Sequence, residues 1–144
     1  MEAVPCDVTT QVSAAITPST ARALVRVHSV GMDVLRAACD GSEDALAEAT
    51  GVFVIAFANY RAKLAQSGDR SVTLVMTADQ HTALADVKNH ATQLTDVLSG
   101  RYSNRALSIA HFELVRSLDL WRNACRQPPP VFRGATALHF DPMR

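Results

Sequence analysis

Cysteine is scarce in this sequence, and the three that occur stand far apart. Cys6, Cys39 and Cys125 form no CxxC pair, and their number is odd. A disulfide framework or a zinc site needs cysteines that are closely spaced or evenly paired. We therefore expect reduced, buried thiols and no structural metal.

Long apolar runs are also missing. The longest uncharged one covers residues 51–58, which is far too short to cross a bilayer. The first twenty residues carry no basic segment followed by a continuous apolar stretch, so they do not predict a secretory signal. With 48% hydrophobic and 19% charged residues in a chain of 144, the composition predicts one globular domain in an intracellular setting.

Motifs that carry catalysis are absent as well. There is no Gly-rich phosphate loop, no carboxylate pair in an acid/base frame, and no activated Ser, Cys or Lys. No two histidines have metal-ligand spacing on a helix, so we expect no enzyme, no cofactor and no metal site. His111 falls at the edge of an apolar helix face, where a hydrogen-bonded core histidine is the expected reading. The histidines are His28, His81, His90, His111 and His139.

Lysine is rare, and the charges are unevenly distributed. The net charge is zero, yet residues 1–100 carry a net charge of −4 and residues 101–144 one of +4. Lys63 and Lys88 are the only lysines, against 12 arginines. Because guanidinium suits bidentate contacts to phosphate and stacking on flat rings, the basic C-terminal part is a candidate for RNA contact.

Apolar residues at helical spacing predict four helices. The first begins at Ser19 or Thr20 as N-cap, and the second follows Ser42 and ends at Gly68. The segment SVTLVMT is typical of a short strand or extended connection. A capping box at Thr77 and Gln80 opens the third helix, which Gly100 ends.

The fourth predicted helix runs from about Ser103 to Cys125, and the prolines at 128–130 end it. We predict an all-α fold, an antiparallel four-helix bundle with a short strand or small sheet. The single domain spans 1–144, with an irregular segment at 1–17 and an extended C-terminal arm at 127–144. That arm keeps Val131, Phe132, Leu138 and Phe140, so it is predicted to be a contact surface.

Helix four carries an arginine stripe opposite its Leu/Trp face. Ile109 and Phe112 lie within the stripe, and a surface of this kind can hold phosphates and stack on unpaired bases. Its charged residues, which share one side at about 100° per residue, are Arg105, Arg116, Asp119 and Arg126.

Four segments follow one another in a telling order. FANYRAKLAQSGDRSVTLVMT combines an aromatic helix end with a strand, and SGRYSNRALS forms an Arg-bearing turn. FELVRSLDLW lies in the fourth helix, and VFRGATALHFD follows it. Taken in this order, the elements resemble the coat proteins of rod-shaped, tobacco-mosaic-like plant viruses.

This resemblance implies a structural capsid protein that self-assembles with helical symmetry around single-stranded RNA. It implies a virion location, otherwise the host cytoplasm, and a homo-polymer of many copies with no membrane partner. The implied RNA-binding residues are Arg101, Asn104, Arg105, Arg116 and Ser117. The implied subunit contacts, together with the apolar VFVIAF stretch, are Val52, Val54, Phe132, Arg133 and Phe140.

Two other readings remain open at this point. One is a soluble helical adaptor or regulatory domain that docks a protein partner through its apolar surface. The other is a haem-binding, globin-like sensor, since the length suits a globin and ADQHTALADVKNH contains two histidines.

Overall fold

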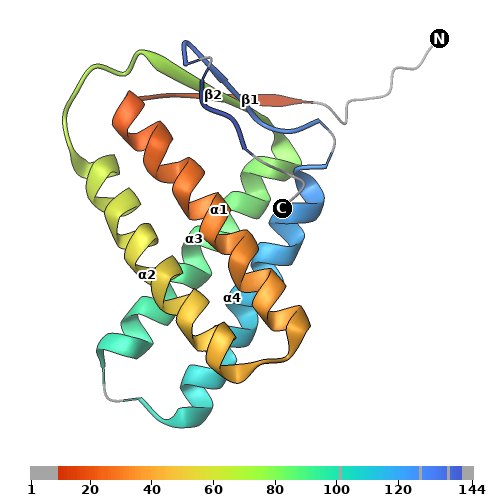
Figure 1. Cartoon of the computed structure of the whole chain (residues 1–144). Helices are drawn as coiled ribbons and strands as arrows, with labels where there is room; N and C mark the ends of the chain where they lie inside the picture. The colour runs from red at the N-terminus through yellow and green to blue at the C-terminus, as the bar shows by residue number, and fades with distance from the viewer. Residues whose placement is uncertain (1–9, 101, 127, 136, 141–144) are drawn as a thin grey trace.

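The computed structural model describes residues 10–100, 102–126, 128–135 and 137–140 (Figure 1). Within these ranges the chain is mostly helical, with four helices and one small antiparallel sheet. The elements in chain order are β1 (Gln11–Ile16), α1 (Pro18–Asp40), α2 (Glu43–Ala65), β2 (Val72–Thr77), α3 (Ala78–Ser99), α4 (Asn104–Ala124) and β3 (Val131–Arg133).

The helices form two antiparallel hairpins, α1 with α2 and α3 with α4, and the second lies behind the first in Figure 1. α1 also packs on α4. Gly31 marks a close approach of these two helices, because a Cβ there would lie 2.8 Å from Leu118 Cδ2. The sheet lies across one end of the helices, and the α1–α2 and α3–α4 turns lie at the other.

Local capping residues set most helix ends. The N-cap of α1 is Thr17, not Ser19 or Thr20 as predicted, because Pro18 takes the first helical position, where no backbone N–H is needed. Thr17 Oγ1 accepts from the Thr20 amide at 3.1 Å. The predicted Ser42 cap is confirmed, although α2 ends at Ala65, before Gly68.

The ends of the other two helices follow the prediction closely. The capping box of Thr77 and Gln80 is present at the start of α3, and Gly100 follows its last residue. Ser103 caps α4, since its Oγ accepts from the Ala106 amide at 3.1 Å. α4 then ends at Ala124, before the prolines.

The sheet has the order β1-β2-β3, with both pairings antiparallel. β2 is the predicted strand, but β1 lies within residues 1–17, which were predicted to be irregular. That prediction is wrong for residues 11–16, which pair with β2 in a register that runs from Gln11 opposite Thr77 to Ile16 opposite Val72. Residues 1–9 lie outside the described part of the chain.

The chain after α4 returns to the sheet as β3 instead of projecting as an arm. Phe132 stands opposite Leu74, and Gly134 turns the strand with φ 90°. A Cβ on Gly134 would lie 2.7 Å from the Ser71 carbonyl oxygen, so a side chain would clash with backbone here. Over its described residues, the segment 127–144 is therefore part of the fold of this chain.

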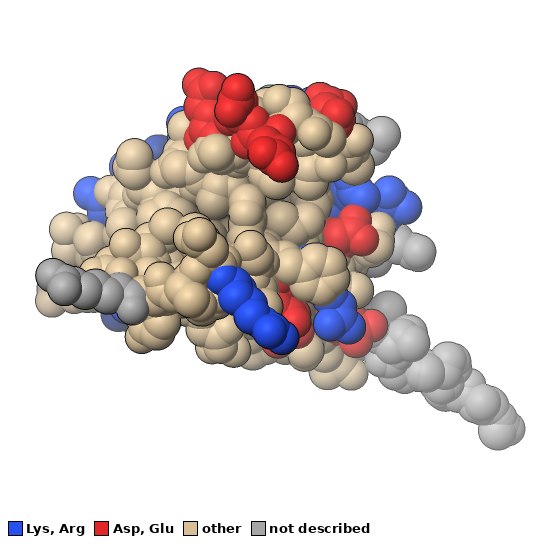
Figure 2. All heavy atoms as spheres, turned by 90° about the horizontal axis from the view of Figure 1, so that it is seen from below, with Lys and Arg blue, Asp and Glu red and all other residues tan. Residues whose placement is uncertain are grey.

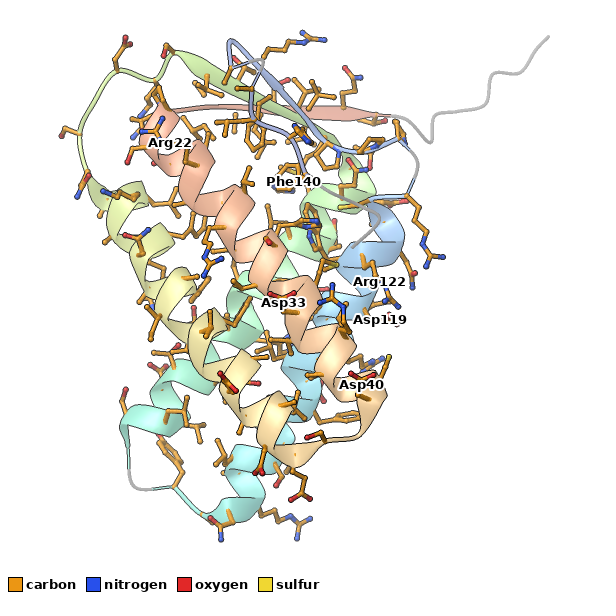
Figure 3. The ribbon with its side chains drawn as sticks, viewed as in Figure 1. Arg22, Asp33, Asp40, Asp119, Arg122 and Phe140 are labelled. Carbon is orange, nitrogen blue, oxygen red and sulfur yellow. The ribbon has the colours of Figure 1, made fainter. Side chains whose placement is uncertain are left out.

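An aromatic cluster joins the sheet to the helices. Phe140 stacks on Phe132 with ring centroids 4.9 Å apart, and its edge contacts involve His28 and Trp121 at 5.2 and 5.8 Å. Trp121 Nε1 donates to His28 Nδ1 at 2.9 Å, which leaves the ring proton of a neutral His28 on Nε2. All four side chains are buried, and Figure 3 places Phe140 between the sheet and the helices.

A buried glutamine fixes the end of α4 against the start of α3. Gln80 Oε1 accepts from the Thr77 amide at 2.8 Å, while Nε2 donates to the carbonyls of Ala124 at 2.9 Å and Pro128 at 2.5 Å. Gln80 is 1% exposed, so these bonds satisfy its polar atoms away from water. One side chain thus caps α3 and fixes the turn after α4.

Candidate nucleic-acid interface

The start of α4 lies at the end of the molecule opposite the sheet. Asn104 and Arg105, two predicted RNA-binding residues, occupy its first turn and are exposed. No acidic residue lies in that turn, so the partial positive charge of the helix N-terminus is not offset locally. Arg101, a third predicted RNA-binding residue, lies outside the described residues.

Arg105 and Arg116 share the outer face of α4. They are eleven residues apart, which places them within about 20° of each other and about 16 Å apart along the axis. Ile109 and Phe112 lie between them and are 53% and 65% exposed. We call this set the α4 outer face, and its residues are Arg105, Ile109, Phe112 and Arg116.

Ion pairs leave most of this charge available. Arg116 Nη1 lies 3.8 Å from Glu113 Oε1, but the Arg116 side chain is 66% exposed, so the pair holds it weakly. Asp119 is occupied instead by Arg122, with Oδ1 and Nη2 2.6 Å apart (Figure 3). Arg126 is exposed at the far end of the helix.

The sequence motif predicted that Ser117 binds RNA, and the structure contradicts this prediction. It is 2% exposed, and its hydroxyl donates to the Leu114 carbonyl at 2.9 Å. The helical spacing already indicated a buried position. Ser117 follows Leu114 by three residues and precedes Trp121 by four, so it lies on the same face of α4 as these two core residues. Ser117 therefore belongs to the packing of α4 and cannot reach RNA from this position.

Tyr102 is a candidate that the sequence interpretation missed. Its side chain is 60% exposed in the turn before α4, and it lines a shallow groove of about 440 Å³ with Ile109, Asp96 and Glu113. An exposed aromatic ring, three residues before Arg105 in the sequence, can stack on an unpaired base. The sequence did contain a signal for this exposure, because Tyr102 is an aromatic residue in a polar turn, where no helix face can bury it.

His111 links α4 to α2 from the inner side. Its Nε2 and Thr50 Oγ1 are 2.9 Å apart, which confirms the expected hydrogen bond, although His111 is half-buried and does not belong to the core. Burial lowers the pKa of His111 below its ordinary value, because a charged ring loses solvation there. The neutral ring therefore prevails near pH 7 and accepts or donates one hydrogen bond to Thr50.

Carboxylates gather on the other hairpin at the same end. Asp40, Glu43 and Asp44 are exposed around the α1–α2 turn, and Figure 2, which looks at this end, shows acidic side chains grouped on one side. An approaching polyanion is repelled there and meets arginine on the α4 side. The division is partial, because Asp96 and Glu113 line the groove at Tyr102 and Figure 2 also shows acidic side chains beside basic ones.

The predicted subunit contacts divide into exposed and buried residues. Val52 is 40% exposed and Arg133 is exposed, whereas Val54 packs against the core. Phe132 and Phe140 are 5% and 3% exposed and belong to the core of this chain, so their assignment as contact residues is wrong. Apolar side chains in a short irregular segment look the same in sequence whether they cover their own core or a neighbour.

The remaining searches concern metals and membranes. Among the described residues, no group of three or more His, Cys, Asp or Glu side chains is placed to hold a metal ion. None of the described helices is long and apolar enough to span a bilayer. In comparisons with known proteins, no family model, curated protein or solved structure matches the chain.

Proposed function

We propose that this protein is a coat protein that polymerises with helical symmetry around single-stranded RNA. The observation that carries the proposal is that arginine and exposed apolar side chains occupy different parts of the molecular surface. The Arg-bearing α3–α4 turn stands at the end opposite the sheet (Figure 1), and the outer faces of α2 and α4 expose apolar side chains along the flanks. Such a subunit presents one end to RNA and its flanks to neighbours.

The order of elements supports the resemblance to tobacco-mosaic-like coat proteins. Two antiparallel hairpins fit an antiparallel four-helix bundle, a strand follows α2, and the Arg-bearing turn joins α3 to α4. Phe132 and Phe140 then close the sheet end of each subunit. In this arrangement the sheet end is the outer end of the subunit and the turn end faces the RNA.

RNA is held by its phosphates. Arg105 lies in the first turn of α4 and Arg116 lies three turns further along the same face, so both guanidinium groups are accessible. Asn104 and Tyr102 add a polar contact and a stacking surface. Because such contacts address the backbone, we expect little sequence preference and an affinity that falls as the salt concentration rises.

The test measures RNA affinity as a function of salt. Arg105→Gln and Arg116→Gln are each compared with wild type by filter binding of a single-stranded RNA between about 50 and 200 mM salt. Each variant should reduce the slope of log affinity against log salt by about 0.7. Arg22→Gln, on the exposed surface of α1 near the sheet (Figure 3), is the matched control and should leave the slope unchanged.

Electron microscopy and sedimentation at about pH 5 and about pH 8, with and without RNA, complete the test. Rods or discs that retain RNA support the coat protein. A monomer in every condition that retains no RNA refutes it and favours a helical adaptor that binds a protein partner.

A further inference from the structure

Two exposed helix faces of this chain have the same spacing and opposite charge. On α4, an apolar pair, Ile109 and Phe112, stands between Arg105 and Arg116 at intervals of four, three and four residues. On α2, another apolar pair is flanked by a carboxylate and an amide at the same intervals. We call that set the α2 outer face, and its residues are Glu48, Val52, Ile55 and Asn59.

Over the described part of the chain, both faces are open to solvent. Ile55 is 73% exposed and Phe112 is 65% exposed. Each lies on the side of its helix away from the buried face, because Phe53 on α2 and Leu114 on α4 point into the core at 0% exposure. On each face this side chain stands next to a second exposed apolar one, Val52 on α2 and Ile109 on α4, and contiguous apolar surface of this kind marks contact sites between proteins.

Two grooves border the α2 outer face, and both lie along the seam between α2 and α1. One groove of about 280 Å³ is lined by Arg26, Val52, Ile55, Ala56 and Asn59. Its apolar part, Val52, Ile55 and Ala56, offers a surface on which the Phe112 phenyl group can pack. The second groove, of about 230 Å³, carries Glu48 in its lining, together with Asp33, which already pairs with Arg36 at 3.1 Å.

Gly51 leaves additional room on the exposed surface of α2. A Cβ at this position would meet nothing within 4 Å in its own chain, so the fold itself gives no reason for glycine here. Glycine in a helix interior costs about 0.5–1 kcal/mol relative to alanine. The missing side chain allows another backbone or a ring to approach α2 from outside.

The geometry favours a second copy of this chain as the occupant. α2 and α4 both run from the turn end toward the sheet end (Figure 1), and the contact of Thr50 with His111 places these two residues at the same height. We compared the heights of the two outer faces by counting residues from Thr50 on α2 and from His111 on α4. Each α4 residue then lies four residues lower than its α2 counterpart, which is about one helical turn, or about 6 Å. A sideways step with a small axial offset therefore places Phe112 beside Ile55 and Arg105 beside Glu48.

We propose that the α4 outer face of one copy docks on the α2 outer face of the next. The pairing is heterologous, since two different faces meet, and it continues as an open chain of subunits. Docking α4 on α4 would bring arginines together, whereas docking α4 on α2 puts the two apolar pairs in contact and places Arg105 near the neighbour's Glu48. Arg105 and Arg116 flank the apolar pair, so they lie at the two ends of the contact, where their guanidinium groups stay open to RNA phosphates. The contact rests on the proposed polymerisation and identifies the surfaces that carry it.

Two disabling variants test the pairing in the absence of RNA. Phe112→Asp spoils the α4 face and Ile55→Asp spoils the α2 face, so each protein alone should sediment as a monomer where wild type polymerises. In an equimolar mixture, the intact α2 face of Phe112→Asp can still bind the intact α4 face of Ile55→Asp. We therefore expect the mixture to form a dimer and nothing larger. Leu98→Asp, at an exposed α3 position on neither face, is the control and should polymerise like wild type.

Circular dichroism must first show that each variant keeps the wild-type helix content. The proposal is overturned if a folded single variant still polymerises, if the mixture stays monomeric, or if wild type is monomeric at high concentration. RNA retention is measured separately. A wild type that polymerises through these faces but retains no RNA would refute the coat function and leave this contact standing.

Discussion

Replacing Gln80 by leucine should destabilise the fold far more than its single position suggests. The substitution removes three side-chain hydrogen bonds, one to the Thr77 amide and two to the carbonyls of Ala124 and Pro128. At about 1 kcal/mol for each net hydrogen bond, Gln80→Leu should lower the free energy of unfolding by about 3 kcal/mol. For a chain of 144 residues, this corresponds to a fall in Tm of about 10 °C.

Thermal unfolding followed by circular dichroism measures this effect, and urea unfolding gives an independent free energy. Gln93→Leu is the matched control, because it makes the same change on an exposed position of the same helix. Its effect should stay within about 0.5 kcal/mol. If the two variants unfold at the same temperature, Gln80 does not connect α3 to the end of α4, and the account of the C-terminal turn is wrong.

Two further predictions concern titratable side chains. Because burial lowers the pKa of His111 in the folded state, the unfolded chain binds the proton more readily, and stability should fall as the pH drops below about 6.5. In His111→Gln the loss of unfolding free energy between about pH 7.5 and about pH 5 should be smaller; an equal loss would show that His111 does not contribute. Burial raises the pKa of the Cys125 thiol to about 12, and the residue is 0% exposed. Cys125→Ala should therefore leave thiol labelling of the native protein unchanged and remove one reactive thiol only after denaturation; slower or reduced native labelling would contradict this burial.

The helices were predictable because their signals are local. The caps at Ser42, Thr77 and Ser103 each act within one turn, so a short window of sequence contains the whole interaction. β1 escaped prediction because its partner β2 lies about 60 residues away, and QVSAAI shows no clear alternation of large apolar side chains. An edge strand of this kind is formed by its neighbour and has little propensity of its own.

The candidate interface was predictable in part, for related reasons. Helical periodicity placed Arg105 and Arg116 on one exposed face, and the structure keeps them there. The same periodicity argued against Ser117, and a short motif match should not have outweighed it. Tyr102 and Ile55 stood out only once burial was known, because an apolar residue is informative when its exposure is unexpected.

The sequence by itself determined the four helices, the strand after α2, and the opposite net charges of the two parts of the chain. Tertiary structure alone decided which apolar residues are buried within this chain and which stay exposed. The difference is physical, because hydrophobic burial has no direction and depends on whatever surface lies across from a side chain. Phe132 and Phe140 meet Trp121 and His28 in their own subunit, whereas Ile55 and Phe112 meet water.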